Sequence, residues 1–172
     1  RATARGASLL GQTTAIALFR APHSSDGRLS ALTLGPEGAT LFAARVVIVA
    51  SGRHEPVLAF GENDLPGVYS ARAALSLWRG GITLGKRAAL IDGGPAADAF
   101  VEATRGRVEV LAVARDQVVR AAGRSKVTGI VLSGEAGERR EKVDAILVGG
   151  AGSPTLELAV QAGAEVDFDA LE

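Results

Sequence analysis

Cysteine and methionine are both absent from this sequence of 172 residues, and histidine occurs only twice, as His23 and His54. Without cysteine the chain can form no disulfide, no thiolate metal site and no redox-active pair of thiols. Two histidines far apart in the sequence do not predict a metal site either. Because the chain begins with arginine rather than methionine, we expect it to be a piece of a longer protein.

An excess of charge and long hydrophobic runs are missing as well. The 19 Lys and Arg residues balance the 19 Asp and Glu residues, and no basic run exceeds two residues. Nucleic acid and membranes are therefore not predicted as partners. The apolar runs are far shorter than the roughly 20 residues that span a bilayer, and no signal peptide is evident near the first residue. We expect a soluble, cytoplasmic protein, with 47% apolar residues to build its core.

The first third of the chain predicts antiparallel strands that lead into a buried one. Strands are expected at residues 13–19, 28–34 and 40–44, with turn clusters at residues 22–27 and 35–38. Residues 46–50, VVIVA, form a short, unbroken and β-branched run. That composition is typical of a central strand buried on both faces.

The rest of the chain predicts alternating helices and strands. Helices are expected at residues 71–79, 95–105 and 155–162, the first with Ser70 as its N-cap and the last behind Ser153 and Pro154. Strands are expected at residues 88–91, 108–113, 117–120, 127–132 and 143–148. The charged residues 138–142 are predicted to form a solvated hairpin tip.

Residues 87–97, RAALIDGGPAA, organise this pattern. An apolar run enters a glycine turn, and a helix begins behind a proline. This is the strand–turn–helix unit of a dinucleotide-binding domain, in which the helix amides face a pyrophosphate. Against the pattern G-x-G-x-x-G/A, the first position holds Asp92, the second Gly94 and the third Ala97, with Gly93 between the first two.

Asp92 weakens this site, because its carboxylate would lie near a dianionic pyrophosphate. At ~4 Å, two like charges repel by about 1 kcal/mol in water and by about 4 kcal/mol at an effective dielectric constant of 20. The N-terminus of a helix favours an anion by only about 0.3–1 kcal/mol, and by ~2 kcal/mol at most. Aspartate tolerates the left-handed conformation, so the turn itself can persist. We interpret the turn as structural, with a working NAD site as the alternative.

Arg115 follows the second strand of this unit. An NAD site usually has an acidic residue at that position to bind the ribose hydroxyls, whereas an arginine favours the 2′-phosphate of NADP. Arg115 therefore suggests NADP, with a solvated surface arginine as the alternative. On these residues, NAD and NADP both remain candidate cofactors.

Four stretches, in this order, carry a resemblance to a known family. They are residues 50–60 (ASGRHEPVLAF), 61–68 (GENDLPGV), 81–97 (GITLGKRAALIDGGPAA) and 143–163 (VDAILVGGAGSPTLELAVQAG). Together they resemble the flavin-dependent alpha subunits of heterotetrameric sarcosine oxidase and the related subunits of opine oxidase and hydrogen cyanide synthase. The resemblance covers the chain from about residue 44 onward, and more loosely the residues before it.

The fold of that family interleaves two dinucleotide domains, an FAD domain interrupted by an NAD domain. The resemblance implies an α/β fold with a Rossmann-like parallel sheet and an antiparallel β-meander, the NAD domain being reduced. It assigns residues 1–60 to an FAD-domain-like meander and closing strand and 61–84 to a connector and helix. It assigns residues 85–149 to a degenerate NAD(P)-binding-like domain and 150–172 to a return segment toward the FAD domain.

The resemblance also implies cofactor contacts outside the turn. Ser51 and Gly52 match the family's A-[ST]-G motif, where the chain passes close to the flavin nucleotide. Gly149 and Gly150 lie in the later stretch that resembles the family. The candidate cofactor-binding residues are therefore Ser51, Gly52, Gly93, Gly94, Ala97, Arg115, Gly149 and Gly150. His54 is interpreted as a structural histidine, with a cofactor contact as the alternative.

Three departures from the family point to a reduced site. No FAD-type glycine fingerprint precedes residue 13, and the helix after the turn is short. Between residues 115 and 127 a hairpin takes the place of the family's next helix and parallel strand. Part of the wall that would hold the adenosine is therefore expected to be missing.

No nucleophile, base and orienting group occur together in the sequence, so we assign no catalytic residue. In such flavoproteins the cofactor carries the redox chemistry. The resemblance implies a fragment of an amine or opine oxidase or dehydrogenase alpha-type subunit, with FAD in the parent protein. Its partners would be the other subunits, and its substrate a small amine reached through the complex. The alternatives are a non-catalytic Rossmann-like binding or assembly module and, more weakly supported, an NAD(P)-dependent reductase.

Overall fold

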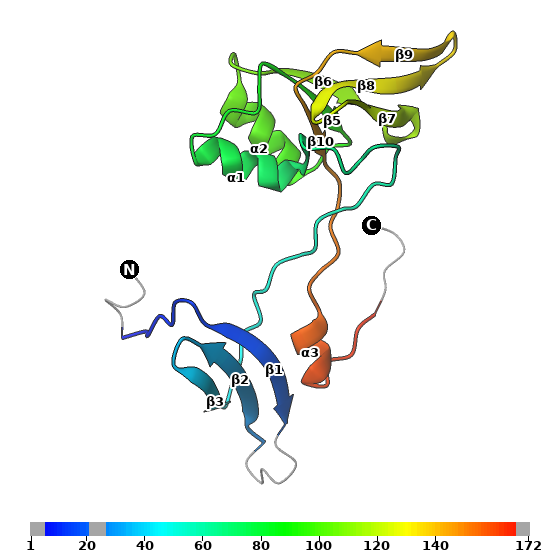
Figure 1. Ribbon diagram of the computed structural model, residues 1–172. Coiled ribbons are helices and arrows are strands. Elements are labelled where there is room, and N and C mark those ends of the chain that lie inside the picture. The colour runs from blue at the N-terminus through cyan, green and yellow to red at the C-terminus, as the bar shows by residue number, and fades with distance from the viewer. Residues whose placement is uncertain (1–5, 21–26, 168–172) are drawn as a thin grey trace. The chain divides into compact units, whose positions relative to one another are not determined.

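Two compact units make up the chain in the computed structural model, which describes residues 6–20 and 27–167. One unit comprises Arg1–Gly52 and Pro154–Glu172, and the other comprises Arg53–Ser153. The strands of the two units belong to separate sheets, and most of them are labelled in Figure 1. His23 and most of the turn predicted at residues 22–27 lie outside the described residues.

The unit formed by Arg53–Ser153 is built around a four-stranded parallel sheet. Its strands, in order across the sheet, are β4 (Val68–Ser70), β10 (Ala145–Val148), β5 (Arg87–Ile91) and β6 (Glu109–Val113). The central strands are continuous apolar runs because both of their faces are covered. The strands predicted at residues 88–91, 108–113 and 143–148 are confirmed, with small differences at their ends.

Two helices, α1 (Ala71–Arg79) and α2 (Pro95–Thr104), cover one face of this sheet (Figure 1). Ser70 caps α1 as predicted, because its Oγ accepts a hydrogen bond of 3.1 Å from the Ala73 N–H. Gly80 follows α1, and its N–H bonds to a carbonyl of the last turn. Both predicted helices are confirmed.

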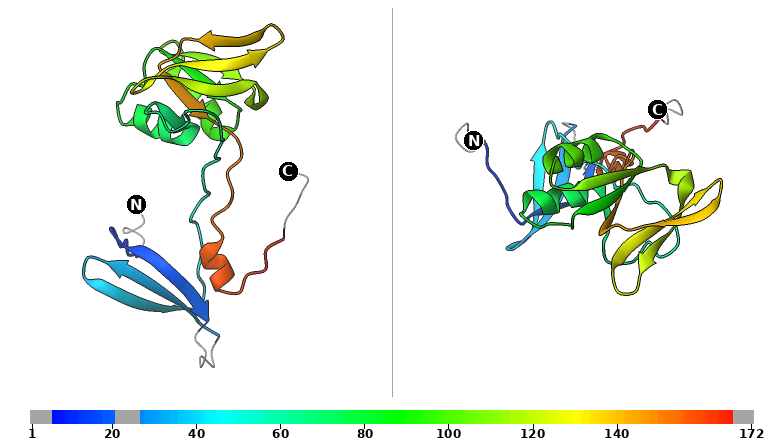
Figure 2. Two further views of the ribbon diagram at one scale, coloured as in Figure 1. Left: turned by 45° about the vertical axis from the view of Figure 1, so that its right-hand side comes forward. Right: turned by 90° about the horizontal axis from the view of Figure 1, so that it is seen from above.

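A three-stranded antiparallel sheet covers the other face of the parallel sheet (Figure 2). After β6 a short 3-10 turn, η2 (Arg115–Gln117), leads into this sheet. Its strands are β7 (Val118–Gly123), β8 (Val127–Gly134) and β9 (Gly137–Glu141). The unit therefore has three layers, with the parallel sheet in the middle.

Strand alternation places successive side chains in the two cores of this unit. Leu90 and Leu147 pack toward the helices together with Phe100, which is fully buried. Ile91 and Ile146 point the other way and pack against the antiparallel sheet. The two apolar cores fix the ends of β5, β6 and β10, where the predicted turn lies.

The other unit contains a three-stranded antiparallel sheet in the order β1-β2-β3. Its strands are β1 (Thr14–Arg20), β2 (Leu29–Gly35) and β3 (Gly38–Ala44), as predicted to within a few residues. A short helix, α3 (Glu157–Gln161), packs beside β1. The Leu18 N–H donates a hydrogen bond of 3.1 Å to Gln161 Oε1.

The prediction of a buried central strand at residues 46–50 is wrong. This segment is in no strand, and the side chain of Ile48 is 87% exposed. A strand buried on both faces needs hydrogen-bonded neighbours and a layer on each side. In the part of the chain that the structure describes, no strand pairs with this segment.

Residues 138–142 do not form the hairpin tip that the sequence predicted. Residues 138–141 belong to β9, which pairs antiparallel with β8 from Gly134↔Gly137 to Ile130↔Glu141. The tip lies at residues 135 and 136. β9 is an edge strand, and its charged side chains are mostly exposed, as is common for edge strands.

The third helix begins later than predicted, at Glu157 rather than residue 155. The Thr155 N–H donates to the Gly52 carbonyl at 3.1 Å, and the Thr155 carbonyl accepts from Ser51 Oγ at 3.1 Å. These two bonds hold Thr155 against residues 51–52. The helix can begin only after that contact.

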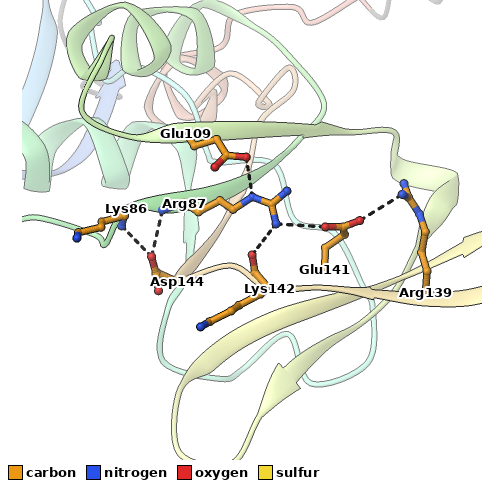
Figure 3. A network of polar contacts seen from close by, with 7 residues as sticks. All are labelled: Lys86, Arg87, Glu109, Arg139, Glu141, Lys142 and Asp144. Carbon is orange, nitrogen blue, oxygen red and sulfur yellow. Dashed lines mark hydrogen bonds and ion pairs between the residues drawn. The ribbon is translucent and has the colours of Figure 1, made fainter.

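Arg87, at the start of β5, joins the parallel sheet to β9 (Figure 3). Its Nε donates to Glu109 Oε1 at 2.8 Å, and its Nη1 donates to Glu141 Oε2 at 3.2 Å. Nη1 also donates to the Lys142 carbonyl at 2.9 Å. The hydrogen bond to Glu109, followed by the one to Glu141, raises the pKa of Arg87 above its ordinary value.

Asp144 fixes the same end of the sheet from the loop before β10. Its Oδ2 accepts hydrogen bonds from the backbone N–H groups of Lys86, at 2.7 Å, and Arg87, at 3.1 Å (Figure 3). These two bonds, the one from Lys86 first, lower the pKa of Asp144. The carboxylate is therefore stabilised in the folded chain relative to the unfolded one.

We predict that the Asp144→Asn substitution removes a pH-dependent part of the stability. The folded pKa is lowered, so this contribution is complete above the unfolded value of about 3.9 and disappears as the pH falls through the folded value. Urea unfolding should show a wild-type advantage over Asp144→Asn at pH ~6 that shrinks below pH ~4. Asp116→Asn is the control, because no hydrogen bond or ion pair reaches that exposed side chain within the described residues. A constant difference at all pH values would contradict the assignment.

Candidate functional site

Six of the eight predicted cofactor-binding residues come together at one edge of the parallel sheet. Gly93, Gly94 and Ala97 follow β5, and Arg115 follows β6. The other two, Gly149 and Gly150, follow β10. The carboxyl ends of parallel strands meet at the same edge, and ligands of such sheets bind there.

The turn after β5 has the backbone shape expected of a glycine turn, although its first position is an aspartate. Asp92 has a φ of 58°, in the left-handed region, and Gly94 has a φ of 120°. The Asp92 N–H donates to the Val113 carbonyl at 3.2 Å, and the Asp98 N–H donates to the Gly94 carbonyl at 2.9 Å in the first turn of α2. The turn therefore persists with aspartate at its first position, as the sequence indicated.

The turn lies in direct backbone contact with the end of β10. The Gly149 N–H donates to the Ile91 carbonyl at 2.7 Å, and the Gly150 N–H donates to the Gly93 carbonyl. A Cβ atom on Gly149 would lie 2.7 Å from the Gly93 oxygen and 2.8 Å from the Asp92 oxygen. Glycine is required at position 149 because the two backbones approach so closely.

An ion pair that the sequence did not predict crosses this edge of the sheet. Both Nε and Nη2 of Arg115 lie 2.7 Å from Asp92 Oδ2. Charge-assisted hydrogen bonds of this length are among the stronger side-chain contacts. Arg115 suggested binding of the 2′-phosphate of NADP, and Asp92 was expected to repel a pyrophosphate. In the structure these two side chains bind each other. The available signal was the pairing of β5 with β6, which brings residues just beyond their ends together.

The cavity directly at the glycine turn is small. The cavity lined by Gly93, Gly94, Ala97 and residues 148–150 has a volume of about 20 Å³. Such a volume accommodates about one water molecule. In the described residues β6 is the last strand at its side of the sheet, and the chain passes from it into the antiparallel sheet. This cavity by itself is too small for the pyrophosphate of an NAD(P) molecule.

The structure of this chain is similar to solved structures of known proteins, of which three are described here. The first is an L-proline dehydrogenase from P. horikoshii, with 21% identity and a TM-score of 0.73 over 91% of this chain and 31% of that one. The second is a NAD-dependent persulfide reductase from A. fulgidus, with 16% identity and a TM-score of 0.68 over 96% of this chain and 36% of that one. The third is an ornithine N-hydroxylase from Kutzneria sp. 744, solved with reduced FAD, NADP⁺ and L-ornithine. It has 13% identity and a TM-score of 0.56 over 82% of this chain and 54% of that one.

The chain has the fold of FAD/NAD-dependent flavoprotein oxidoreductases. The predicted α/β fold, a Rossmann-like parallel sheet with an antiparallel meander, is thereby confirmed. The chain spans between about a third and just over half of the length of these three proteins. No protein-family model and no curated protein sequence matches it.

The remaining two predicted residues, Ser51 and Gly52, belong to the other unit. Both are exposed and hold Thr155 through the hydrogen bonds described above. The Thr155 Oγ1 atom is buried and has no hydrogen-bond partner within the described residues. The one helix described in this unit, α3, is not preceded by a glycine turn. The described residues of this unit therefore do not by themselves form a cradle for the FAD pyrophosphate.

The described residues contain no group of three His, Cys, Asp or Glu side chains placed to hold a metal ion. None of their helices is long and apolar enough to cross a bilayer. The backbone N–H of His54 donates to the Ser153 carbonyl at 2.7 Å, which gives this residue a place in the fold.

We predict that Gly149→Ala destabilises the chain by about 1–3 kcal/mol, the range for overpacking at a close contact. The new Cβ atom would lie too close to two carbonyl oxygens of the turn. Gly93→Ala is the matched control, because a Cβ atom there meets no atom within 4 Å. Denaturant unfolding of both variants is the measurement, and equal losses would contradict the close contact.

Proposed function

We propose that this chain forms part of a flavin-dependent oxidoreductase in which the NAD-type domain no longer binds a nucleotide. The domain would serve folding and assembly, while FAD, held largely by other parts of the protein, carries the redox chemistry. The fold of the similar structures supports the first half of this proposal. The geometry of the turn supports the second.

The observation that carries the proposal is the ion pair between Asp92 and Arg115. A dinucleotide would need the space and the positive charge that this pair occupies. The carboxylate must leave the guanidinium or stay beside the incoming phosphates, and either arrangement costs free energy. The cavity of about 20 Å³ at the same helix end would also have to open.

We further propose a secondary amine or amino-acid derivative as the substrate of the parent enzyme. The motifs shared with the alpha subunits of amine and opine oxidases support this class. So does the similarity to an L-proline dehydrogenase, since L-proline is a secondary amine. Ser51 and Gly52 would approach the flavin nucleotide, and the other subunits of the complex would be the partners. A cytoplasmic location remains a prediction from the sequence.

A non-catalytic module that kept the fold and lost nucleotide binding is the second candidate, favoured by the same closed turn. The two candidates differ in flavin content. We predict that the full-length protein, purified without added cofactor, carries the visible absorption of an oxidised flavin. A fully folded protein without flavin, even after incubation with FAD, would support the module and contradict the enzyme.

We predict no saturable binding of NADH or NADPH to the wild-type protein in calorimetric titrations. Asp92→Gly should bind either nucleotide more tightly than the wild type, because it removes a carboxylate and releases Arg115. The matched control is Asp98→Ala, which removes a carboxylate from the first turn of α2 and leaves the ion pair intact. Saturable binding to the wild-type protein in the micromolar range would contradict the closed turn.

A further inference from the structure

A second hollow lies in the unit Arg53–Ser153, beside the turn. It has a volume of about 340 Å³ and lies between residues 53–56, α1 and the start of α2. Its polar lining comprises three arginines, Arg53, Arg72 and Arg79, and one carboxylate, that of Glu55. Leu75 and Ala99 are among the apolar residues that line it. We call this hollow the arginine groove.

The charges of the arginine groove are not balanced internally. Arg72 forms an ion pair with Glu55, and its Nη2 also donates to the Arg53 carbonyl at 3.1 Å. The guanidinium groups of Arg53 and Arg79 have no partner within the described residues. The groove therefore has an excess of two positive charges on a chain whose net charge is zero.

The backbone holds Arg53 in place beside the groove. The neighbouring His54 N–H is bonded to the Ser153 carbonyl at 2.7 Å, and Arg72 holds the Arg53 carbonyl. The stem of Arg53 packs over Gly152, where an added Cβ atom would lie 2.9 Å from Arg53 Cδ. Arg79 is fixed in the last turn of α1. Contacts within the fold therefore position the stem of Arg53 and the backbone of Arg79.

We propose that the arginine groove binds a small organic polyanion with two or more carboxylate or phosphate groups. Guanidinium groups bind both kinds of oxyanion in a planar, two-pronged geometry, so two unpaired arginines match two anionic groups. Apolar side chains in the lining suit a compact carbon body between them. The volume lies at the lower end of the range for small-molecule sites, roughly 300–1,000 Å³. This site is independent of the proposed function, since it requires neither a flavin nor opening of the turn.

The test uses citrate and inorganic pyrophosphate as probes in calorimetric titrations of the protein at low salt. We expect saturable binding of at least one probe, weakened by added salt because the site is exposed. Arg53→Ala and Arg79→Ala should each weaken it roughly tenfold or more, as for loss of a hydrogen bond to a charged group. Binding of citrate alone would identify a carboxylate site, and binding of pyrophosphate alone a phosphate site.

The matched control is Arg107→Ala, which removes the same charge from an exposed arginine outside the groove. This variant should bind as the wild type does. Absence of saturable binding of either probe, or an equal loss in Arg107→Ala, would overturn the proposal. Circular dichroism and urea unfolding would verify that the variants remain folded. Neither outcome bears on flavin content, so a failure here is distinguishable from a failure of the proposed function.

Discussion

The proposed loss of nucleotide binding at the edge of the parallel sheet depends on the ion pair between Asp92 and Arg115. It joins the residues just beyond β5 and β6, at the edge where ligands of parallel sheets bind. The pair satisfies the charge of the Asp92 carboxylate just before the N-terminus of α2. It also binds the guanidinium of Arg115, the residue from which the sequence suggested NADP. In the proposed function the strand–turn–helix unit serves the fold rather than nucleotide binding.

The three layers of the unit hold the turn after β5 in place. The apolar cores on the two faces of the parallel sheet fix β5 and β10 side by side. Their ends are then close enough for Gly149 and Gly150 to bond with the turn. At the opposite end of the strands, Arg87 and Asp144 hold the same layers together with polar contacts. Contacts with the end of β10 and with Arg115 therefore leave little space directly at the turn.

Most of this architecture was predictable because its signals are local. Ser70 and Gly80 mark the ends of α1, and the pattern after Ile91 marks the turn. The failures concern contacts between distant residues. Residues 46–50 have the composition of a buried strand but no neighbour among the described residues, and Thr155 is held by residues 51–52. Arg115 and Asp92 were interpreted separately, since nothing local to either residue indicates that they pair.

A double-mutant cycle on Asp92 and Arg115 tests this account most directly. The stabilities of the wild type, Asp92→Ala, Arg115→Ala and the double variant would be measured by urea unfolding. We predict a favourable coupling energy of about 0.5–1 kcal/mol, the upper range for partly exposed ion pairs. A coupling energy of zero would contradict a stabilising ion pair between the two side chains, and with it the observation on which the proposed loss of nucleotide binding rests.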